Sequence, residues 1–394
     1  MDTEDKGVVH QFTTTSLKRV ESTKKTRKST GMYEFDRVLG GGIVPGSIVL
    51  LTGEPGVGKS TLLLQALQSI NTLYISGEES AEQVKDRAER LKVNLDSFSF
   101  SADLQVEAII NGMNELKNTI DVMVVDSVQT LYSKDIDGPP GTVSQLREGA
   151  LKLISAAKKL RIPLLLIGHV TKEGEIAGPK TLEHMVDVVL NFEGERISQF
   201  RILRASKNRF GSTDEIGIFE MHGMGLAEVN NPLAFLEHSK NTVPGKSIVG
   251  IMEGKRPLFY EIQCLASQTM LPMPRRVVRG IDYNKLLLLL AVVRKSLNIP
   301  LDKYDIYVNV IGGVDVKSPA ADLGVVGALV SSLKGIPLPS SSVFIGEVGL
   351  LGEVRKVYSQ EKVIAEATRL KFKHVVSPET ISSVREIKNY LTAE

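Results

Sequence analysis

The sequence predicts an α/β protein in which a mostly parallel sheet is followed by a second, α+β domain. Short apolar runs alternate with helical patterns from about residue 31 to residue 230, and this alternation is typical of βαβ units. A glycine-rich loop lies between the first of these apolar runs and the helical pattern after it. A turn-rich stretch without periodicity, residues 230–245, then indicates a domain junction, and new strands and helices follow it.

Each expected element follows from its own pattern. Apolar runs predict strands at 47–52, 72–76, 121–126, 163–168, 186–193 and 199–206, and helical patterns lie at 58–70, 80–91, 103–118 and 144–160. The last two strands follow each other without a long helix, which predicts an antiparallel edge. Beyond the junction we expect strands at 246–253, 258–266, 304–310, 342–346 and 373–377, and helices at 282–297, 319–333, 359–370 and 378–392.

The composition is that of an ordinary globular protein. The 394 residues suffice for two or three domains, with 42% hydrophobic and 24% charged residues, and the net charge of +2 favours no class of partner. No apolar stretch reaches the length of about 18 residues that a membrane-spanning helix needs, and the N-terminus lacks an apolar signal region. We therefore expect a cytoplasmic protein without a membrane partner.

The single cysteine and a basic run near the N-terminus are the remaining features of composition. Cys264 lies in an apolar run, so we expect a buried hydrophobic residue, no disulfide within the chain and no cysteine-based metal cluster. Residues 18–28 contain six basic residues and one acidic residue. Such a run fits either a solvated, flexible lead-in or an arm that contacts nucleic acid.

Residues 53–61 read GEPGVGKST and match the phosphate-binding pattern G-x-x-x-x-G-K-[ST]. The pattern stands between a strand and a helix, where backbone N–H groups of the loop and the helix N-terminus bind phosphate oxygens. Lys59 is expected to reach the β- and γ-phosphates of ATP, and Ser60 to ligate Mg²⁺. The residues expected to contact the nucleotide are Glu54, Pro55, Gly56, Val57, Gly58, Lys59, Ser60 and Thr61.

Acidic residues after two further strands complete the expected ATPase site. Asp126 ends an apolar strand and is expected to hold Mg²⁺ together with Ser60. Glu78 and Glu79 follow the strand after the loop's helix, and one of them is expected to act as the catalytic base. We favour Glu78, because Glu79 or Ser80 would suit the start of the next helix, but the sequence leaves the choice between the two carboxylates open.

Three further segments are candidates for function. His169 closes a strand, where a polar residue either senses the γ-phosphate or serves the fold. The loops Tyr132–Ser144 and Thr171–Thr181 are candidates for coupling the ATP site to a bound ligand. Surface loops without such a role have the same kind of sequence. Residues 207–211 read KNRFG and expose two cations around an asparagine.

Four motifs together resemble the bacterial DNA-repair family called RadA or Sms: GEPGVGKST, SGEES (76–80), VVDSVQTLY (124–132) and KNRFG. The resemblance runs from about Ser29 to the C-terminus and implies a RecA-like ATPase core. It further implies a homo-hexameric ring that acts as a helicase on single-stranded DNA. In that family, ATP drives translocation and the branch migration of branched recombination intermediates during DNA repair and homologous recombination.

The resemblance also implies roles for particular cations. Lys207 and Arg209 would act catalytically by reaching the nucleotide or DNA of a neighbouring subunit, since a cation supplied in trans stabilises γ-phosphate charge. The two loops would contact DNA, which places Arg147, Lys172 and Lys180 near its phosphates.

The C-terminal half resembles the S5-like, α+β domain of Lon protease in KSPAAD (317–322), ALVSSLKGIP (328–337) and GEV (346–348). The position of the serine nucleophile falls on Ala320, which has no hydroxyl, and the lysine position falls on Glu361, with Lys362 one residue away. Ser318 lies two residues from the nucleophile position and is a poor substitute. We therefore expect a proteolytically inactive domain for oligomerisation and DNA binding. Its expected basic patch is formed by Arg275, Arg276 and Arg279.

The expected organisation is a basic, flexible segment at 1–30, a RecA-like ATPase domain at 31–235 and a Lon-protease-like domain at 236–394. The family normally begins with a four-cysteine zinc module; this chain has no CxxC, so no zinc is expected. A recombinase is an expected partner. Two alternatives to a DNA motor are a Lon-type ATP-dependent protease, which Ala320 disfavours, and a KaiC-like regulatory ATPase, which the Lon-like half and KNRFG disfavour.

Overall fold

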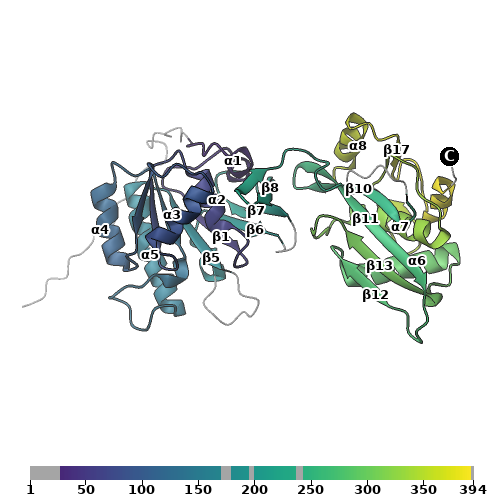
Figure 1. Ribbon diagram of the computed structural model, residues 1–394, viewed down its shortest axis with the longest axis horizontal. Helices are drawn as coiled ribbons and strands as arrows, with labels where there is room; N and C mark the ends of the chain where they lie inside the picture. Colours follow the sequence, from purple (N-terminus) through teal and green to yellow (C-terminus); the bar gives the residue numbers. More distant parts are fainter. Residues whose placement is uncertain (1–26, 170–178, 195–198, 237–242, 392–394) are drawn as a thin grey trace, which may run out of the picture.

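The chain folds around two main β-sheets (Figure 1). The computed structural model describes residues 27–169, 179–194, 199–236 and 243–391. Strands between residues 48 and 228 form a nine-stranded sheet, here called the N-terminal sheet. Strands between residues 246 and 376 form a six-stranded sheet, the C-terminal sheet, and two further short strands pair as a hairpin.

The N-terminal sheet is parallel except at one edge. Its order is β3-β2-β4-β5-β1-β6-β7-β8-β9. Neighbours from β3 to β6 are parallel and the last three strands are antiparallel, as the sequence predicted. The strands are β1 (Ile48–Gly53), β2 (Thr72–Ser76), β3 (Phe98–Ser101), β4 (Val122–Asp126), β5 (Leu164–His169), β6 (Val188–Glu193), β7 (Phe200–Asn208), β8 (Ile216–His222) and β9 (Gly225–Glu228).

Helices cover both faces of the N-terminal sheet. Along β1, Val49 and Leu51 face one core and Ile48 and Leu50 face the other, as the two-residue period of a strand requires. The first core is completed by α1 (Tyr33–Leu39), α2 (Lys59–Ala66) and α3 (Ala81–Arg90), and the second by α4 (Val106–Leu116) and α5 (Val143–Leu160). Burial on both sides explains why the central strands read as continuous apolar runs.

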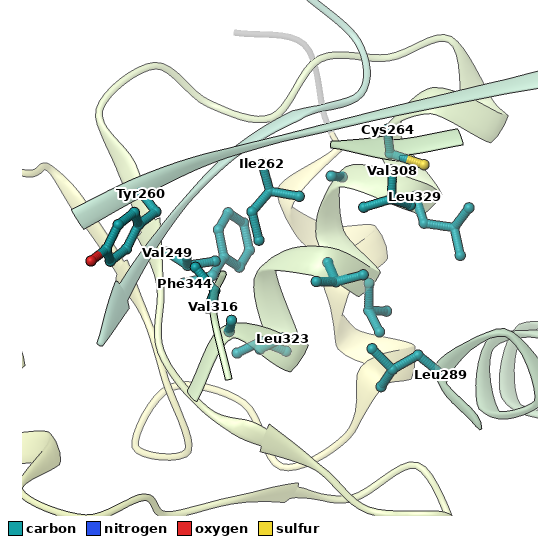
Figure 2. Packing of buried hydrophobic residues seen from close by; sticks show 14 of the residues in the cluster. Val249, Tyr260, Ile262, Cys264, Leu289, Val308, Val316, Leu323, Leu329 and Phe344 are labelled. Carbon is teal, nitrogen blue, oxygen red and sulfur yellow. The ribbon is translucent and has the colours of Figure 1, made fainter. Parts of the chain in front are cut away.

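The C-terminal sheet has the order β12-β13-β11-β10-β14-β17. Its main core includes Val249, Ile262, Leu323 and Phe344, and buried Cys264 packs there as predicted (Figure 2). The strands are β10 (Lys246–Glu253), β11 (Arg256–Gln268), β12 (Arg276–Arg279), β13 (Tyr304–Val310), β14 (Ser342–Phe344) and β17 (His374–Val376), with the hairpin β15 (Glu347–Val348) and β16 (Val354–Arg355). The helices are α6 (Tyr283–Leu297), α7 (Asp322–Lys334) and α8 (Gln360–Arg369).

Ion pairs and aromatic rings join the two sheets. Arg256, at the start of β11, pairs with the fully buried Glu34 of α1 at 2.7 Å. The ring of Phe235 lies 4.5 Å from that of Phe200 in β7 and 4.7 Å from that of Tyr260 in β11. The link between the sheets is therefore built from buried groups on both sides.

The structure contains elements that the sequence patterns did not predict. Six strands, β3, β8, β9, β12, β15 and β16, and the short helix α1 were missed. The first two turns expected at 378–392 are a loop, and a 3₁₀ helix spans Val384–Tyr390. At the N-terminal boundary, Lys28 forms a bridge to Ile43 and Thr30 is buried, so packed structure begins before residue 31.

Candidate nucleotide site

The GEPGVGKST sequence forms the turn from β1 into α2. Gly58 directly precedes the helix with a φ of 110°, a left-handed value that favours glycine. A Cβ on Gly53 would meet the carbonyl oxygen of Phe192 in β6 at 2.4 Å, so β6 closes one side of the loop. Residues 54–56 are exposed at the head of α2. Backbone N–H groups at such a helix N-terminus attract phosphate.

Lys59 is held inside this loop. Its side chain is buried, and Nζ donates to the carbonyl oxygens of Gly53 (2.9 Å) and Glu54 (3.0 Å) and to Nδ1 of His169 (3.0 Å). Burial lowers the pKa of Lys59 to about 8, and the carboxylates of Asp126 and Glu78 oppose that shift. An anionic phosphate would be a stronger partner for the ammonium group than these uncharged acceptors.

The carboxylate of Asp126 accepts two hydroxyl groups on one oxygen. Asp126 ends β4 and is buried, and its Oδ2 accepts from Ser60 Oγ and from Tyr74 OH, both at 2.6 Å. Burial and the nearby carboxylate raise the pKa of Tyr74, so the phenol stays protonated. Ser60 and Asp126, the predicted metal ligands, thus lie in direct contact. A hydroxyl and a carboxylate are the hard oxygen donors that Mg²⁺ takes, so the pair fits that ion.

Glu78 is connected to the phosphate loop through His169. Its Oε1 accepts from Ser127 Oγ, and its Oε2 lies 3.4 Å from Nε2 of His169, without hydrogen-bond geometry. Because Nδ1 of His169 accepts from the Lys59 ammonium, the proton of the neutral imidazole is on Nε2, which faces Glu78. Lys59, His169 and Glu78 therefore form one polar chain at the carboxyl ends of β1, β5 and β2.

Glu79 faces away from this chain. Its Oε1 pairs with Arg87 in α3, and its backbone N–H donates to Ser76 Oγ at 3.1 Å. Ser80 begins α3 with a capping box. The geometry thus favours Glu78 over Glu79 as the base, although the catalytic role itself stays a prediction.

Lys207 and Arg209 lie at the opposite end of the sheet. Arg209 pairs with Asp187 Oδ1 at 3.2 Å, and Asp187 Oδ2 accepts from the N–H of Ile48, the first residue of β1. Lys207 Nζ donates to the carbonyl oxygen of Glu183 at 2.8 Å, and burial together with Arg209 lowers its pKa. Strand β1 has six residues. At this length it separates the two cations from the phosphate loop of their own chain by about 16 Å.

The residues predicted to contact DNA differ in whether their side chains are exposed to solvent or bonded within the protein. Arg147, Lys180 and Arg275 are exposed, and Lys172 lies outside the described residues. Arg276 donates to backbone carbonyl oxygens at 2.5 and 2.7 Å, and burial lowers its pKa. Its guanidinium is therefore engaged within the C-terminal sheet, which favours a structural role over phosphate contact.

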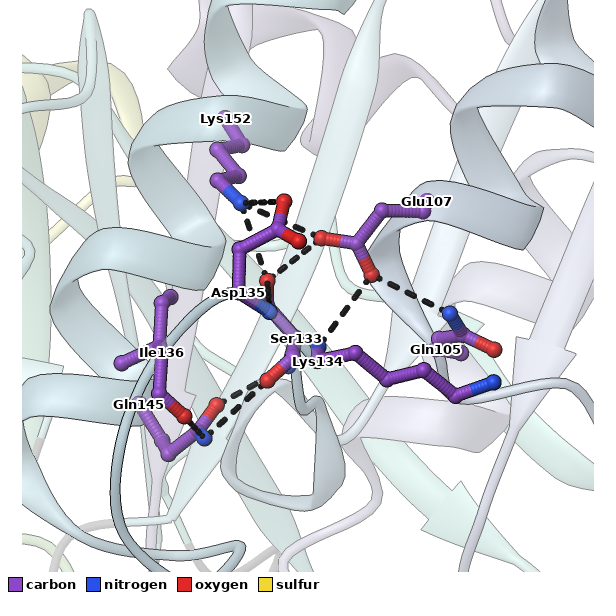
Figure 3. Close-up of polar contacts among 8 residues, drawn as sticks. All are labelled: Gln105, Glu107, Ser133, Lys134, Asp135, Ile136, Gln145 and Lys152. Atoms are coloured by element: carbon purple, nitrogen blue, oxygen red, sulfur yellow. Dashed lines mark hydrogen bonds and ion pairs between the residues drawn. The ribbon is translucent and has the colours of Figure 1, made fainter.

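The loop Tyr132–Ser144 is anchored by two polar side chains that follow it (Figure 3). Gln145 Nε2 donates to the carbonyl oxygens of Ser133 (3.2 Å), Ile136 (2.6 Å) and Gly138 (3.0 Å). Lys152 Nζ binds Glu107 (3.1 Å), Asp135 (2.7 Å) and Ser133 Oγ (3.0 Å). The base of this loop is thus fixed to α4 and α5. The other candidate loop, Thr171–Thr181, lies mostly outside the described residues.

The position of the Lon-type nucleophile is occupied by a buried residue of a short 3₁₀ turn. Ala320 lies between Pro319 and Ala321, ahead of α7. The hydroxyl oxygen of Ser318 accepts from the N–H of Ala320 at 3.3 Å, so Ser318 caps this turn.

Two residues beside the site carried no recognisable sequence signal. Tyr74 binds Asp126, and Arg201 of β7 is buried with its Nε donating to the carbonyl oxygen of Val57 in the phosphate loop at 3.1 Å. Their partners lie 52 and 144 residues away along the chain, so no local motif includes them. The one hint in the sequence is general: each residue places a polar group between two apolar neighbours in a strand.

The parallel sheet, the glycine loop after β1 and the cluster of Lys59, Ser60, Asp126 and Glu78 define a P-loop nucleotide-binding protein of the α/β class. A sequence profile described as "Family of unknown function (DUF7125)" matches residues 27–215. A solved structure titled "Crystal structure of the RadB recombinase" is similar at 23% identity and a TM-score of 0.40, covering 51% of this chain and 99% of that chain.

Named relatives match most of the chain. It is 49% identical over 365 residues to DNA repair protein RadA of Bacillus subtilis (strain 168), covering 91% of this chain and 79% of the relative. It is 48% identical over 370 residues to DNA repair protein RadA of Listeria monocytogenes serovar 1/2a, covering 92% and 80%. The chain therefore belongs to the family of the DNA repair protein RadA, which confirms the resemblance seen in the sequence and supports an ATPase of DNA repair and recombination. Among the described residues, no helix has both the length and the apolar character required to cross a membrane.

Proposed function

We propose that this protein is a DNA-dependent ATPase that works as a motor on DNA. The observation that carries the proposal is the convergence of Lys59, Ser60, Asp126 and Glu78 at the carboxyl end of the parallel sheet, in a member of the RadA family. A phosphate-binding loop with a lysine, an oxygen pair for a metal ion and a separate carboxylate are the groups that hydrolysis of a nucleoside triphosphate requires.

The residues present divide the work of hydrolysis. Backbone N–H groups of residues 56–61 bind the phosphates, and Lys59 exchanges its carbonyl partners for the β- and γ-phosphates. Ser60 and Asp126 hold Mg²⁺, which when bound neutralises charge on the phosphates. Glu78 orients the attacking water and accepts its proton. His169, which touches both Lys59 and Glu78, senses the occupant of the phosphate loop.

The assembly in this proposal is a homo-hexameric ring on single-stranded DNA that promotes branch migration of recombination intermediates. Its support is the place of Lys207 and Arg209, which lie at the far end of β1 from their own phosphate loop. A neighbouring subunit's nucleotide is a site that such cations can serve. Arg147, Lys172 and Lys180 face DNA phosphates in this arrangement. A recombinase is the proposed partner, and the cytoplasm the proposed location.

The second half of the chain, residues 236–394, is proposed to be a Lon-protease-like domain that scaffolds the ring and binds DNA without proteolysis. Ala320 supports the loss of proteolysis, because no hydroxyl stands at the nucleophile position and Ser318 caps a turn instead. The ATPase domain in this proposal is the one expected at 31–235, extended to include the packed residues 28–30, and it follows a basic N-terminal segment.

One experiment tests the motor directly. ATP hydrolysis is measured with and without single-stranded DNA over a range of salt concentrations, together with unwinding of a branched DNA, for wild type and Lys59→Ala. We expect DNA to stimulate hydrolysis, rising salt to weaken that stimulation, and Lys59→Ala to abolish turnover. Equal hydrolysis with and without DNA in every salt condition would contradict a DNA motor.

A further inference from the structure

Tyr74 reaches from one strand of the parallel sheet to the metal-ligand candidate on the next. Strands β2 and β4 are parallel neighbours, with Tyr74 opposite Val124, two positions before Asp126. The side chain of Tyr74 is 2% exposed and packs in the core on the α2 and α3 face of the sheet. Close packing fixes the orientation of the ring, so the hydroxyl is delivered to one place.

The hydroxyls of Tyr74 and Ser60 meet on a single oxygen. Both donate to Oδ2 of Asp126 at 2.6 Å, one from the sheet and one from the first turn of α2. The terminal torsion of an aspartate side chain is soft, so one hydrogen bond leaves the carboxylate plane poorly defined. Two short bonds to an ionised oxygen from separate elements restrict that rotation.

We propose that Tyr74 is a positioning residue that orients the Asp126 carboxylate for the divalent cation of a bound nucleoside triphosphate. The inference rests on the proposed nucleotide site, in which Ser60 and Asp126 hold the ion. Outer-shell hydrogen bonds of this kind hold a metal-binding oxygen in its required direction. A phenol that merely filled the core would contribute to stability and leave the affinity for the cation unchanged.

The test uses the full chain, with Mn²⁺ as the probe ion and a fluorescent ATP analogue as the nucleotide. Tyr74→Phe removes only the hydroxyl, and Tyr260→Phe is the matched control, because Tyr260 is 1% exposed and lies in the C-terminal sheet. Nucleotide affinity is measured in EDTA, and the Mn²⁺ affinity of the protein–nucleotide complex by electron paramagnetic resonance of the free ion. For Tyr74→Phe we expect Mn²⁺ affinity to fall about 10-fold or more, with metal-free nucleotide affinity within about twofold of wild type.

Enzyme kinetics give a second readout. In Tyr74→Phe the Mg²⁺ concentration for half-maximal ATP hydrolysis should rise, while turnover at saturating Mg²⁺ stays close to wild type. Unchanged Mn²⁺ affinity, or an equal loss of nucleotide affinity in EDTA, overturns the positioning role. Tyr260→Phe should behave as wild type in every measurement.

The outcomes also separate this inference from the function on which it rests. If the wild-type protein binds no nucleotide, and no Mn²⁺ in the presence of nucleotide, the proposed nucleotide site and the role of Tyr74 are both overturned. A wild-type protein that binds both, beside a Tyr74→Phe variant with normal Mn²⁺ affinity, overturns only the role of Tyr74. If Tyr74→Phe does not fold, 3-fluorotyrosine at position 74 is used instead, because it keeps the hydroxyl. Its fluorine NMR resonance should shift when Mg²⁺ binds to the protein–nucleotide complex. A resonance that does not shift overturns the proposal.

Discussion

At the residue scale, the two adjacent glutamates Glu78 and Glu79 have different neighbours, so we expect them to differ in function. Glu78 lies beside His169 and Ser127, whereas Glu79 pairs with Arg87 on α3. The Glu78→Gln variant should bind ATP as wild type does, since Lys59 and the loop are intact, while turnover falls about 100-fold or more because the base is lost. Equilibrium nucleotide binding and steady-state hydrolysis measure the two effects.

Glu79→Gln is the matched control for this change. It alters the neighbouring carboxylate in the same way but leaves the group facing His169 in place. Turnover within a few-fold of wild type is expected. A large loss of turnover in Glu79→Gln, with Glu78→Gln active, would assign the base to Glu79 instead.

The buried Asp322 makes stability depend on pH. Burial raises its pKa from 3.8 to about 6, although Lys285 lies at 3.0 Å from the carboxylate. Between these two pH values the folded chain binds more protons than the unfolded chain, so the free energy of unfolding falls as pH rises through this window. A shift of this size corresponds to an effect on the order of 3 kcal/mol.

Asp322→Asn removes the titrating group and should therefore remove that slope. Relative to wild type, the variant should gain stability from pH 4 to pH 7, as measured by denaturant unfolding at each pH. Asp137→Asn, at an exposed position, provides the control. A constant difference between Asp322→Asn and wild type across this range would show that Asp322 does not carry the shift.

At the element scale, the sequence predicts what local patterns define. The central strands β1, β4 and β5 are buried on both faces, so their apolar runs are visible without knowledge of their neighbours. Strand β3 is four residues long and partly exposed, and β12 consists of two valines between two arginines. Both are edge strands, whose formation depends on a partner that is distant in sequence. The same reason hides Tyr74 and Arg201, whereas Lys59, Ser60 and Asp126 stand in local motifs.

We expect the anchored loop Tyr132–Ser144 to contribute to the stimulation of ATP hydrolysis by DNA. Gln145 is buried and binds three carbonyl oxygens of the segment that it follows. Gln145→Ala leaves these acceptors without the amide, at a cost of about 1–3 kcal/mol for a buried group. We expect faster proteolytic cleavage within the loop and weaker stimulation of ATP hydrolysis by DNA.

Basal hydrolysis without DNA should change little in Gln145→Ala, since Lys59, Asp126 and Glu78 make no contact with this amide. Gln68→Ala, at an exposed position of the same half, is the control. Protection from protease equal to wild type would show that Gln145 does not anchor the loop.

At the scale of the whole molecule, strand β7 links the phosphate loop to the C-terminal sheet. Arg201 on β7 donates to the loop carbonyl of Val57, and Arg204, three residues later, pairs with Glu253 of β10 at 2.7 Å. A shift in the loop would therefore act on a strand that pairs with β6 and β8 in its own sheet and also reaches the second sheet through Arg204. Buried, packed groups transmit such shifts because they do not deform freely.

The separation between the phosphate loop and Lys207 leads to a prediction about the proposed ring. If Lys207 acts on a neighbour's nucleotide, a Lys59→Ala subunit and a Lys207→Ala subunit each lack a different half of a shared site. Each variant alone should be inactive in ATP hydrolysis. In an equal mixture, some interfaces combine the intact phosphate loop of a Lys207→Ala subunit with the intact Lys207 of a Lys59→Ala subunit. Random assembly makes about a quarter of the interfaces complete in this way.

Mixing the two variants should therefore restore about a quarter of wild-type hydrolysis, provided that subunits exchange before the assay. The matched control pairs Lys59→Ala with Asp126→Asn, because both substitutions damage the same side of the interface and their mixture should stay inactive. No recovery with Lys207→Ala, in rings shown by native mass spectrometry to contain both variants, would place the action of Lys207 elsewhere. In that case the role of Lys207 would be structural. Its ammonium group donates to the carbonyl oxygen of Glu183 and so supports the segment before β6.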